Sequence, residues 1–180
     1  SQDAVVQFVG YERVTIRANS STKVLNDRLT IGENFTLSMD NRKGGFPQNS
    51  EQNAVSASYK HHPLLPVYDI AGNFAGSRGL NLGNNNAPFA RLSRNQDDRS
   101  KRIRAFGSVY AEARIADKVT AKTIFGFDVI GRRGLYIGRP QPEYIEGNFI
   151  NSQTSLFQNS YQWNFTNQVT YKETFNDVHK

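Results

Sequence analysis

Segment 161–172 reads YQWNFTNQVTYK and alternates between apolar and polar residues. Successive side chains of a β-strand point to opposite faces of the sheet. The segment therefore predicts a strand with one aromatic face and one hydrogen-bonding face. A soluble sandwich would bury the apolar face, whereas an outer-membrane barrel turns it toward lipid and turns the polar face toward a wet lumen. The apolar positions are Tyr161, Trp163, Phe165, Val169 and Tyr171.

The same alternation recurs in four earlier segments. We expect five strands, at about residues 11–25, 29–42, 101–115, 119–130 and 159–174. Short turns are predicted at 26–28, 116–118 and 176–177, because Asn and Asp are natural turn formers. The apolar phase holds across each short turn, so the strands should be antiparallel and paired in sequence order. The predicted fold class is all-β, an up-and-down antiparallel sheet of about five strands.

Two long intervals, at about residues 43–100 and 131–158, separate these hairpins. All short connections fall on one edge of the sheet and both long ones on the other, an asymmetry typical of outer-membrane barrels, whose extracellular loops are long. Strands of 12 to 14 residues would reach about 40–46 Å, enough to cross an apolar band of about 25 Å when tilted. Bacterial single-chain barrels have at least eight strands, so we expect a fragment of a larger barrel.

The composition further limits the classes of protein to which this chain can belong. The chain has no cysteine, which excludes a disulfide scaffold and a thiolate metal site. No apolar run approaches the roughly 20 residues of a membrane helix.

The net charge of +6 is spread along the chain, with one dense basic run, RSKRIR, at 99–104. Its alternation with apolar residues favours a strand entering a membrane over a nucleic-acid patch. The chain begins SQDAVVQF, without an initiator Met or a signal peptide, which indicates an excised piece or a mature product.

Several side chains could in principle carry chemistry. Asp97 and Asp98 are adjacent carboxylates, but such pairs usually point apart, and we interpret them as part of a solvated charged loop. His61 and His62 lack a third ligand at a suitable spacing, so no metal site is expected. No nucleophile motif is present. The sequence predicts no enzyme and no cofactor.

Four segments resemble the SusC/RagA class of TonB-dependent outer-membrane transporters. Segment 11–45 is similar to an early barrel hairpin of that class, and PLLPVYDIAGNFAGS at 63–77 resembles its first long external loop, P-x-x-P-V-Y-D-x-x-G-N-F. Segment 86–104 resembles the return from that loop, with APFA where the family commonly has N-P-V-A. Segment 161–180 is similar to the closing Y-x-W-x-x-x-N-x-L-x-Y-x-x-x-F-x-x-x-H.

The resemblance implies a 22-stranded barrel in the Gram-negative outer membrane, with a plug in its lumen, coupling to the TonB complex and a SusD-like surface lipoprotein as lid. The cargo of the class is glycans or peptides. The plug and the TonB-contacting segment are absent from this chain, so residues 1–180 would be a partial barrel domain that contacts the rest of the barrel, the plug and lipid.

In this interpretation the large apolar residues face the membrane, and the first long loop is the functional surface. The loop candidates for ligand binding are Tyr59, Tyr68, Asp69, Phe74 and Phe89. The membrane-facing candidates are Val14, Ile16, Phe35, Leu37, Phe125, Phe127, Tyr161, Trp163, Phe165, Val169 and Tyr171.

A soluble all-β carbohydrate-binding module is the alternative. Aromatic residues such as Tyr161, Trp163 and Tyr171 could then stack on sugar rings, whereas in a barrel they would be girdle residues. A soluble module would have to bury Val14, Phe35, Phe125 and Trp163 in one core. The discriminating question is what the apolar face contacts.

Overall fold

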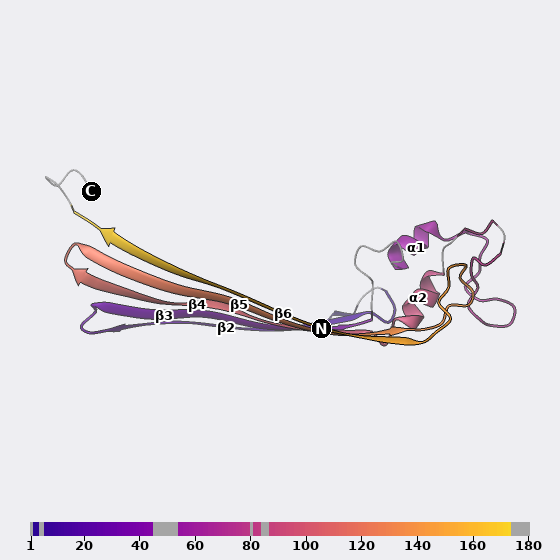
Figure 1. Ribbon diagram of the computed structural model, residues 1–180, viewed down its shortest axis with the longest axis horizontal. Helices are drawn as coiled ribbons and strands as arrows, with labels where there is room; N and C mark the ends of the chain where they lie inside the picture. Colours follow the sequence, from indigo (N-terminus) through magenta and orange to yellow (C-terminus); the bar gives the residue numbers. More distant parts are fainter. Residues whose placement is uncertain (1, 4–5, 45–53, 80, 84–86, 174–180) are drawn as a thin grey trace. The chain divides into compact units, whose positions relative to one another are not determined.

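The computed structural model describes residues 2–3, 6–44, 54–79, 81–83 and 87–173. Its strands form one sheet in the order β1-β2-β3-β4-β5-β6, so each strand pairs with its neighbours in sequence (Figure 1). The five long strands are antiparallel and run up and down, which confirms the predicted fold class. Their bounds are β2 Gly10–Val24, β3 Leu29–Lys43, β4 Arg99–Ala116, β5 Val119–Gly138 and β6 Ser152–Tyr171. The two-residue strand β1, Gln2–Asp3, was not expected and pairs with the start of β2.

Two of the predicted tight turns are present. Residues 25–28 connect β2 to β3, and Leu25, Asn26 and Asp27 all have positive φ, between 53° and 64°. Asp117 and Lys118 connect β4 to β5. Asn and Asp tolerate the left-handed region better than other non-glycine residues, which explains two of the three positions in the first turn. The turn predicted at 176–177 lies outside the described residues.

The β5–β6 hairpin is longer than the alternation predicted. Toward the short β4–β5 turn, Gly126 of β5 lies beside Asn164 of β6. Toward the long β5–β6 loop, Gly138 of β5 lies beside Ser152 of β6. Both pairs fit one antiparallel register without a bulge. Pairing extends beyond 130 because backbone hydrogen bonds do not require apolar alternation, which ends near the GRRG segment at 131–134.

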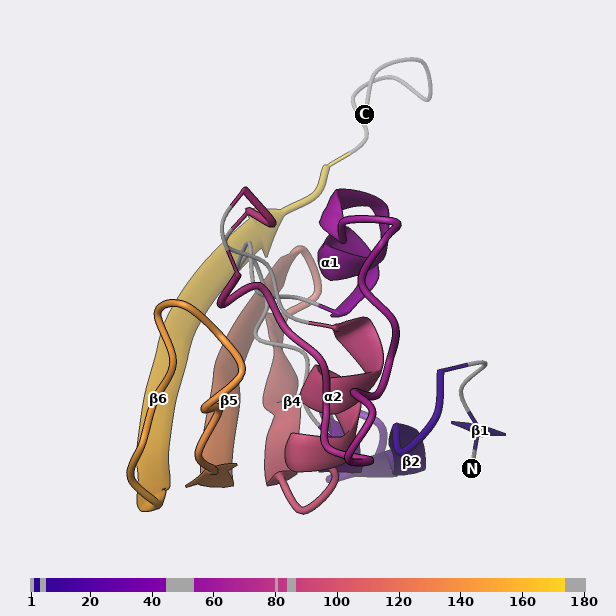
Figure 2. The same cartoon turned by 90° about the vertical axis from the view of Figure 1, so that its right-hand side faces the viewer.

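Two short helices occur in the interval between β3 and β4, where no sustained period was visible. Helix α1 spans Ala54–Lys60 and α2 spans Pro88–Arg94. Pro88 stands at the start of α2, where its missing N–H costs nothing. Each helix has seven residues, about two turns, which is too short for helical periodicity to be recognised. The two helices contact each other (Figure 2).

The chain divides into two compact units, which are considered separately. The sheet unit comprises Val14–Met39, Arg102–Gly131 and Gln158–Lys180. The loop unit comprises Ser1–Arg13, Asp40–Lys101 and Arg132–Phe157. The loop unit has a small core, in which the buried apolar residues are Ala54, Ala57, Ala75, Ala87, Ala90 and Tyr144.

Candidate functional site

The sheet unit buries polar side chains and exposes apolar ones. On β3, Thr36 and Ser38 are only 5% and 2% exposed, whereas Ile31 and Met39 are 43% and 51% exposed. A water-soluble domain normally shows the reverse pattern. We call the face that carries the odd-numbered residues of β3–β6 and the even-numbered residues of β2 the apolar face, and the opposite face the polar face.

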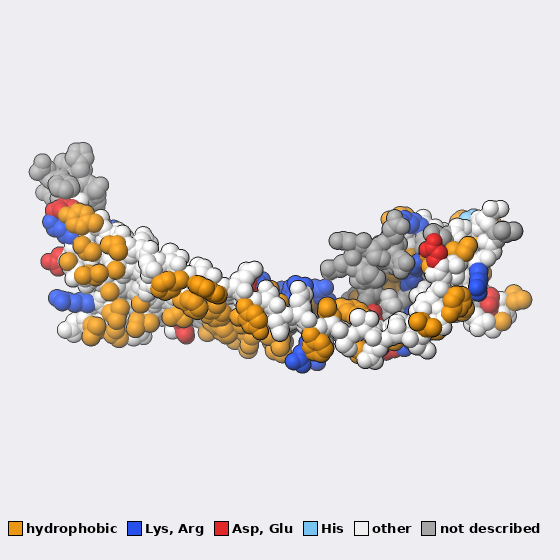
Figure 3. Space-filling view, viewed as in Figure 1, with side chains coloured by type: hydrophobic (Ala, Val, Ile, Leu, Met, Phe, Trp, Pro, Cys, Tyr) orange, Lys and Arg blue, Asp and Glu red, His pale blue; other side chains and the backbone are white. Residues whose placement is uncertain are grey.

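The predicted membrane-facing residues all lie on this apolar face. Hydrophobic side chains gather along the strands in Figure 3. Phe35, Leu37 and Phe127 are half-buried. The others are 44–73% exposed: Val14, Ile16, Phe125, Tyr161, Trp163, Phe165, Val169 and Tyr171.

Phe35 and Phe127 are half-buried because they contact each other. Their ring centroids are 6.3 Å apart, and Phe125 follows at 6.5 Å from Phe127. Phe35 belongs to β3 and Phe127 to β5, so the two rings meet across β4. Gly107 of β4 lies against the backbone of Phe35 and carries no side chain between the rings. The result is an aromatic cluster in the middle of the apolar face.

On the polar face, charged side chains of β4 and β5 form ion pairs with each other. Arg104 of β4 donates two hydrogen bonds to Asp128 of β5, at 2.9 and 2.5 Å. Nearer the turn, Lys122 Nζ lies 3.2 Å from a Glu112 carboxylate oxygen and 4.8 Å from the Tyr110 ring centroid. Two parallel N–H···O bonds add orientation as well as energy. The two ion pairs therefore fix β4 against β5 on a face that remains polar.

Two shallow hollows lie on the sheet unit. The larger, of about 480 Å³, is lined mainly by even-numbered residues of the polar face. Its polar lining consists of Asn34, Ser108, Asp128, Gln162 and Asn164, with Phe106 and Trp163 among its apolar residues. Amide, hydroxyl and carboxylate groups of this kind can donate and accept hydrogen bonds with a polar ligand.

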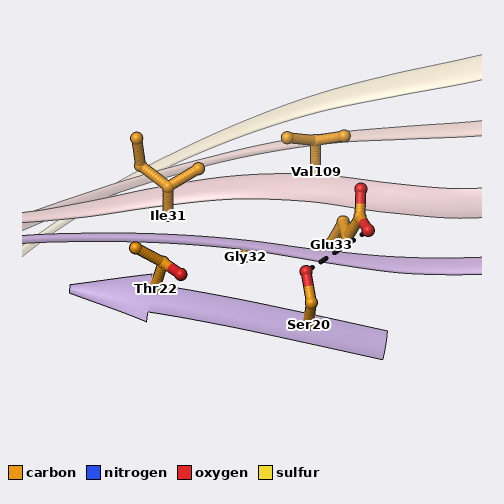
Figure 4. Close-up of a pocket in the computed structure, with 6 residues that line it drawn as sticks. All are labelled: Ser20, Thr22, Ile31, Gly32, Glu33 and Val109. Atoms are coloured by element: carbon orange, nitrogen blue, oxygen red, sulfur yellow. Dashed lines mark hydrogen bonds between the residues drawn. The ribbon is translucent and has the colours of Figure 1, made fainter. Parts of the chain in front are cut away.

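The smaller hollow, of about 300 Å³, contains a carboxylate on the apolar face (Figure 4). Glu33 accepts a hydrogen bond of 3.3 Å from Ser20 and lies close to Ile31 and Val109. Sequence reasoning missed Glu33. Its position in the sequence could have indicated this placement, because Glu33 alternates with Ile31 and Phe35 and therefore lies on the same face of the strand.

In the loop unit, three of the five predicted loop candidates meet. Tyr68 and Phe74 stack at 5.4 Å between centroids and 18° between planes, and Phe89 packs edge-on against both, at 6.4 and 6.2 Å. Phe8, which the sequence did not single out, extends the cluster at 6.0 Å from Phe89. Tyr59 on α1 is 74% exposed and contacts none of these rings.

Asp69 holds the turn between the stacked rings. Its carboxylate accepts hydrogen bonds from the backbone N–H groups of Asn73 and Ala71, at 2.8 and 2.9 Å. The bond from Asn73 is the main reason that the pKa of Asp69 lies below its ordinary value. The carboxylate of Asp69 therefore forms hydrogen bonds within its own loop and stabilises the turn. Ile70, at the tip of this loop, is fully exposed.

A buried ion pair joins the two long connections of the loop unit. Arg94 of α2 binds Glu143 with two hydrogen bonds of 2.5 and 2.9 Å, and both side chains are about nine-tenths buried. The same guanidinium lies 5.1 Å above the Phe74 ring. Arg78 donates to the Pro142 carbonyl at 2.9 Å. These residues are far apart in the sequence, so no local sequence pattern predicted their contacts.

The two adjacent aspartates are not simply solvated, which corrects the sequence interpretation. Asp98 is only 8% exposed and accepts the Ile137 N–H at 2.8 Å, whereas Asp97 pairs with Arg139. Burial raises the pKa of Asp98. The two carboxylates point to different partners, as expected for neighbours in sequence.

The histidines serve local turns. His61 Nε2 lies 3.1 Å from the Leu65 carbonyl, and His62 Nδ1 accepts the Leu64 N–H at 3.3 Å. Among the described residues, no three His, Cys, Asp or Glu side chains gather in a group that could hold a metal ion.

No protein-family model matches the chain, and no curated protein matches it. Within the described ranges, no helix is both long and apolar enough to cross a membrane.

Proposed function

We propose that this chain is part of the barrel wall of a SusC/RagA-like, TonB-dependent transporter of the Gram-negative outer membrane. The complete transporter would import glycans or peptides together with a SusD-like surface lipoprotein. The chain itself contributes wall and external loops, and it performs no catalysis.

The inverted burial of the sheet unit is the observation that carries this proposal. Large apolar side chains such as Trp163, 73% exposed, cover one face, and the opposite face buries Thr36 and Ser38. Each Å² of apolar surface left in water forgoes about 25 cal/mol. A lipid environment removes that penalty, and a polar lumen suits the Arg104–Asp128 pair on the other face.

The proposed orientation places the loop unit outside the cell, because its connections are the long ones. The cluster of Tyr68, Phe74 and Phe89 gives its first loop a fixed shape. Such a loop can present a constant surface to a lid protein or to cargo, since little ordering entropy is then lost on binding.

The first test uses the complete reading frame that contains this chain. We expect the protein to fractionate with outer membranes, to need detergent for extraction, and to migrate differently on gels before and after heating, as folded barrels do. A protein that stays soluble and monomeric without detergent would refute the proposal in favour of the carbohydrate-binding module.

The second test addresses transport. Deleting residues 63–83 should weaken association with the co-encoded lipoprotein, or uptake of its cargo, while membrane insertion persists. A matched control replaces the β4–β5 turn residues with another two-residue hairpin turn, Asp117→Asn/Lys118→Gly, which alters the opposite edge of the sheet and should leave lid binding unchanged. Unchanged lid binding and uptake after the loop deletion would show that the loop is only a connection.

A further inference from the structure

We infer that basic residues at the loop-side end of the apolar face form a binding site for the phosphate groups of an anionic membrane lipid. This inference rests on the proposed function, because it needs the apolar face to contact lipid. The residues are Lys43 of β3, Lys101 of β4 and Arg133 of β5.

Strand alternation places all three on the apolar face. Lys43 Cβ lies 3.8 Å from the position that a Cβ on Gly10 would occupy, and Gly10 has the same parity as Val14 on β2. Arg133 lies 5.7 Å above the Phe157 ring, and Phe157 has the same parity as Trp163 on β6.

Lys101 lies two residues before Ile103 on β4 and therefore on the same face. Counting along the strands from the Glu112–Lys122 ion pair brings Lys101 opposite Arg133, and counting from the nearer Arg104–Asp128 pair brings it two residues away. The Gly44 N–H donates to the Asp98 carbonyl, which puts Lys43 opposite Arg99, two residues beyond Lys101. The three cations therefore lie on adjacent strands within about two residues of one level.

These cations are not neutralised by the described part of the chain. None of the three forms an ion pair there, whereas nearby Arg139 is paired with Asp97, and Arg99 donates to the carbonyls of Gln96 and Asp98. The carboxylate of the same face at this level is Glu12, on β2, and no ion pair joins it to the three cations. Local positive charge therefore remains for a partner to neutralise.

The surroundings favour a lipid over a soluble anion. Directly toward the turns along the same strands come exposed apolar residues, with Met39 at 51% and Ile103 at 48% exposure. Phe157, 72% exposed, lies at the level of the cations. Long basic side chains and aromatic rings at the border of an apolar band are the arrangement that meets lipid headgroups. A guanidinium also matches phosphate oxygens in a fork geometry.

The run RSKRIR supplies a matched control. Arg102 and Arg132 are the sequence neighbours of Lys101 and Arg133, on the same two strands, but they lie on the polar face. The pair of substitutions Lys101→Gln/Arg133→Gln and the pair Arg102→Gln/Arg132→Gln therefore remove the same charge at the same level from opposite faces.

The experiment measures binding of bisphosphorylated lipid A to the complete detergent-purified transporter by native mass spectrometry, with phosphatidylethanolamine as the neutral comparison. Since each surface cation contributes about 1 kcal/mol to anionic-lipid binding, the Lys101→Gln/Arg133→Gln protein should bind lipid A about thirtyfold more weakly, and the control pair less than about twofold. Arg133→Lys, which keeps the charge, should retain most of the affinity.

The possible results separate the inference from the proposed function. Equal losses in the two pairs, or no loss in either, would overturn the lipid site while leaving the barrel proposal intact. A wild-type protein that does not fractionate with outer membranes would overturn both. If the double variant fails to insert, Lys101→Gln alone should give a loss of about threefold to fivefold, and no loss would again overturn the site.

Discussion

At the scale of single residues, the loop unit depends on charges that are paired away from water. The guanidinium of Arg94 and the carboxylate of Glu143 share two hydrogen bonds and are about nine-tenths buried. Arg94→Met would leave the Glu143 charge without its partner, at a cost of about 3–5 kcal/mol to local stability. Hydrogen exchange of the amides around Phe74 and Glu143, in the complete protein, should show this as a lower free energy of opening.

The control for that prediction is an exposed pair. Lys118, 54% exposed, pairs with Glu173, and Lys118→Met should cost about 0–1 kcal/mol, because solvent screens such pairs. The double variant Arg94→Met/Glu143→Met should recover part of the loss, since no buried charge remains unpaired. If Arg94→Met and Lys118→Met had equal effects, the buried pair would be irrelevant to the loop unit.

Two aspartates should respond to pH in opposite directions. Burial raises the pKa of Asp98 above 3.8. The folded loop unit therefore holds a proton on this carboxylate at pH values where the unfolded chain has already lost it. Stability contributed by this group therefore falls as pH rises from about 3.8 through the raised pKa. Protection of the Ile137 amide, corrected for intrinsic exchange, should decrease over that window, and Asp98→Asn should abolish the change while keeping an acceptor oxygen for Ile137.

Asp69 provides the opposite sign. Its pKa is lowered, chiefly by the hydrogen bond from the Asn73 N–H, so its contribution is present above 3.8 and lost as pH falls through the depressed pKa. Protection of the Asn73 amide should therefore decrease on acidification. A common direction for the Ile137 and Asn73 amides would contradict the assignment of both groups.

At the scale of elements, the strands could be predicted where side chains alternate. Residues 101–115 and 119–130 carry apolar residues at most of their odd-numbered positions, and both segments lie within observed strands. The phase ends near Gly131, yet β5 continues to Gly138, because its backbone groups still find partners on β6. Helices α1 and α2 were missed for a different reason, since seven residues cannot display a helical period. Contacts such as Arg94 to Glu143 depend on chain connections that a local pattern does not record.

Glycines on the polar face also determine how neighbouring strands fit. The Tyr110 ring lies over Gly32, so that a Cβ there would fall 2.4 Å from a ring atom. Gly32→Ala should displace Tyr110 from Lys122 and destabilise the β3–β4 pair by about 1–3 kcal/mol. Thermal unfolding of the complete detergent-solubilised protein, followed by gel shift, measures the change.

Gly131→Ala serves as the comparison, because the nearest atom to its added Cβ would be 3.5 Å away, an ordinary contact. Gly131 is also a strand glycine, on β5, so backbone entropy acts in the same direction in both variants. Equal unfolding temperatures for Gly32→Ala and Gly131→Ala would mean that the Tyr110 ring moves aside without cost.

At the scale of the whole molecule, the decisive property is which face meets an apolar solvent. Phe165, 59% exposed, belongs to the apolar face near the middle of β6, and its neighbour Thr166 lies on the polar face. An arginine on the lipid-facing side of a barrel costs about 2–4 kcal/mol near the bilayer midplane. In the complete protein, Phe165→Arg should therefore lower stability against denaturant and the yield of folded protein in outer membranes. Thr166→Arg, with the same new charge one residue away, should fold almost normally because it meets water in the lumen. A soluble module would bury this same face in its core, so Phe165→Arg would destabilise it as well. The two functions then separate on where the unaltered protein is recovered, because only a barrel protein fractionates with outer membranes and needs detergent for extraction.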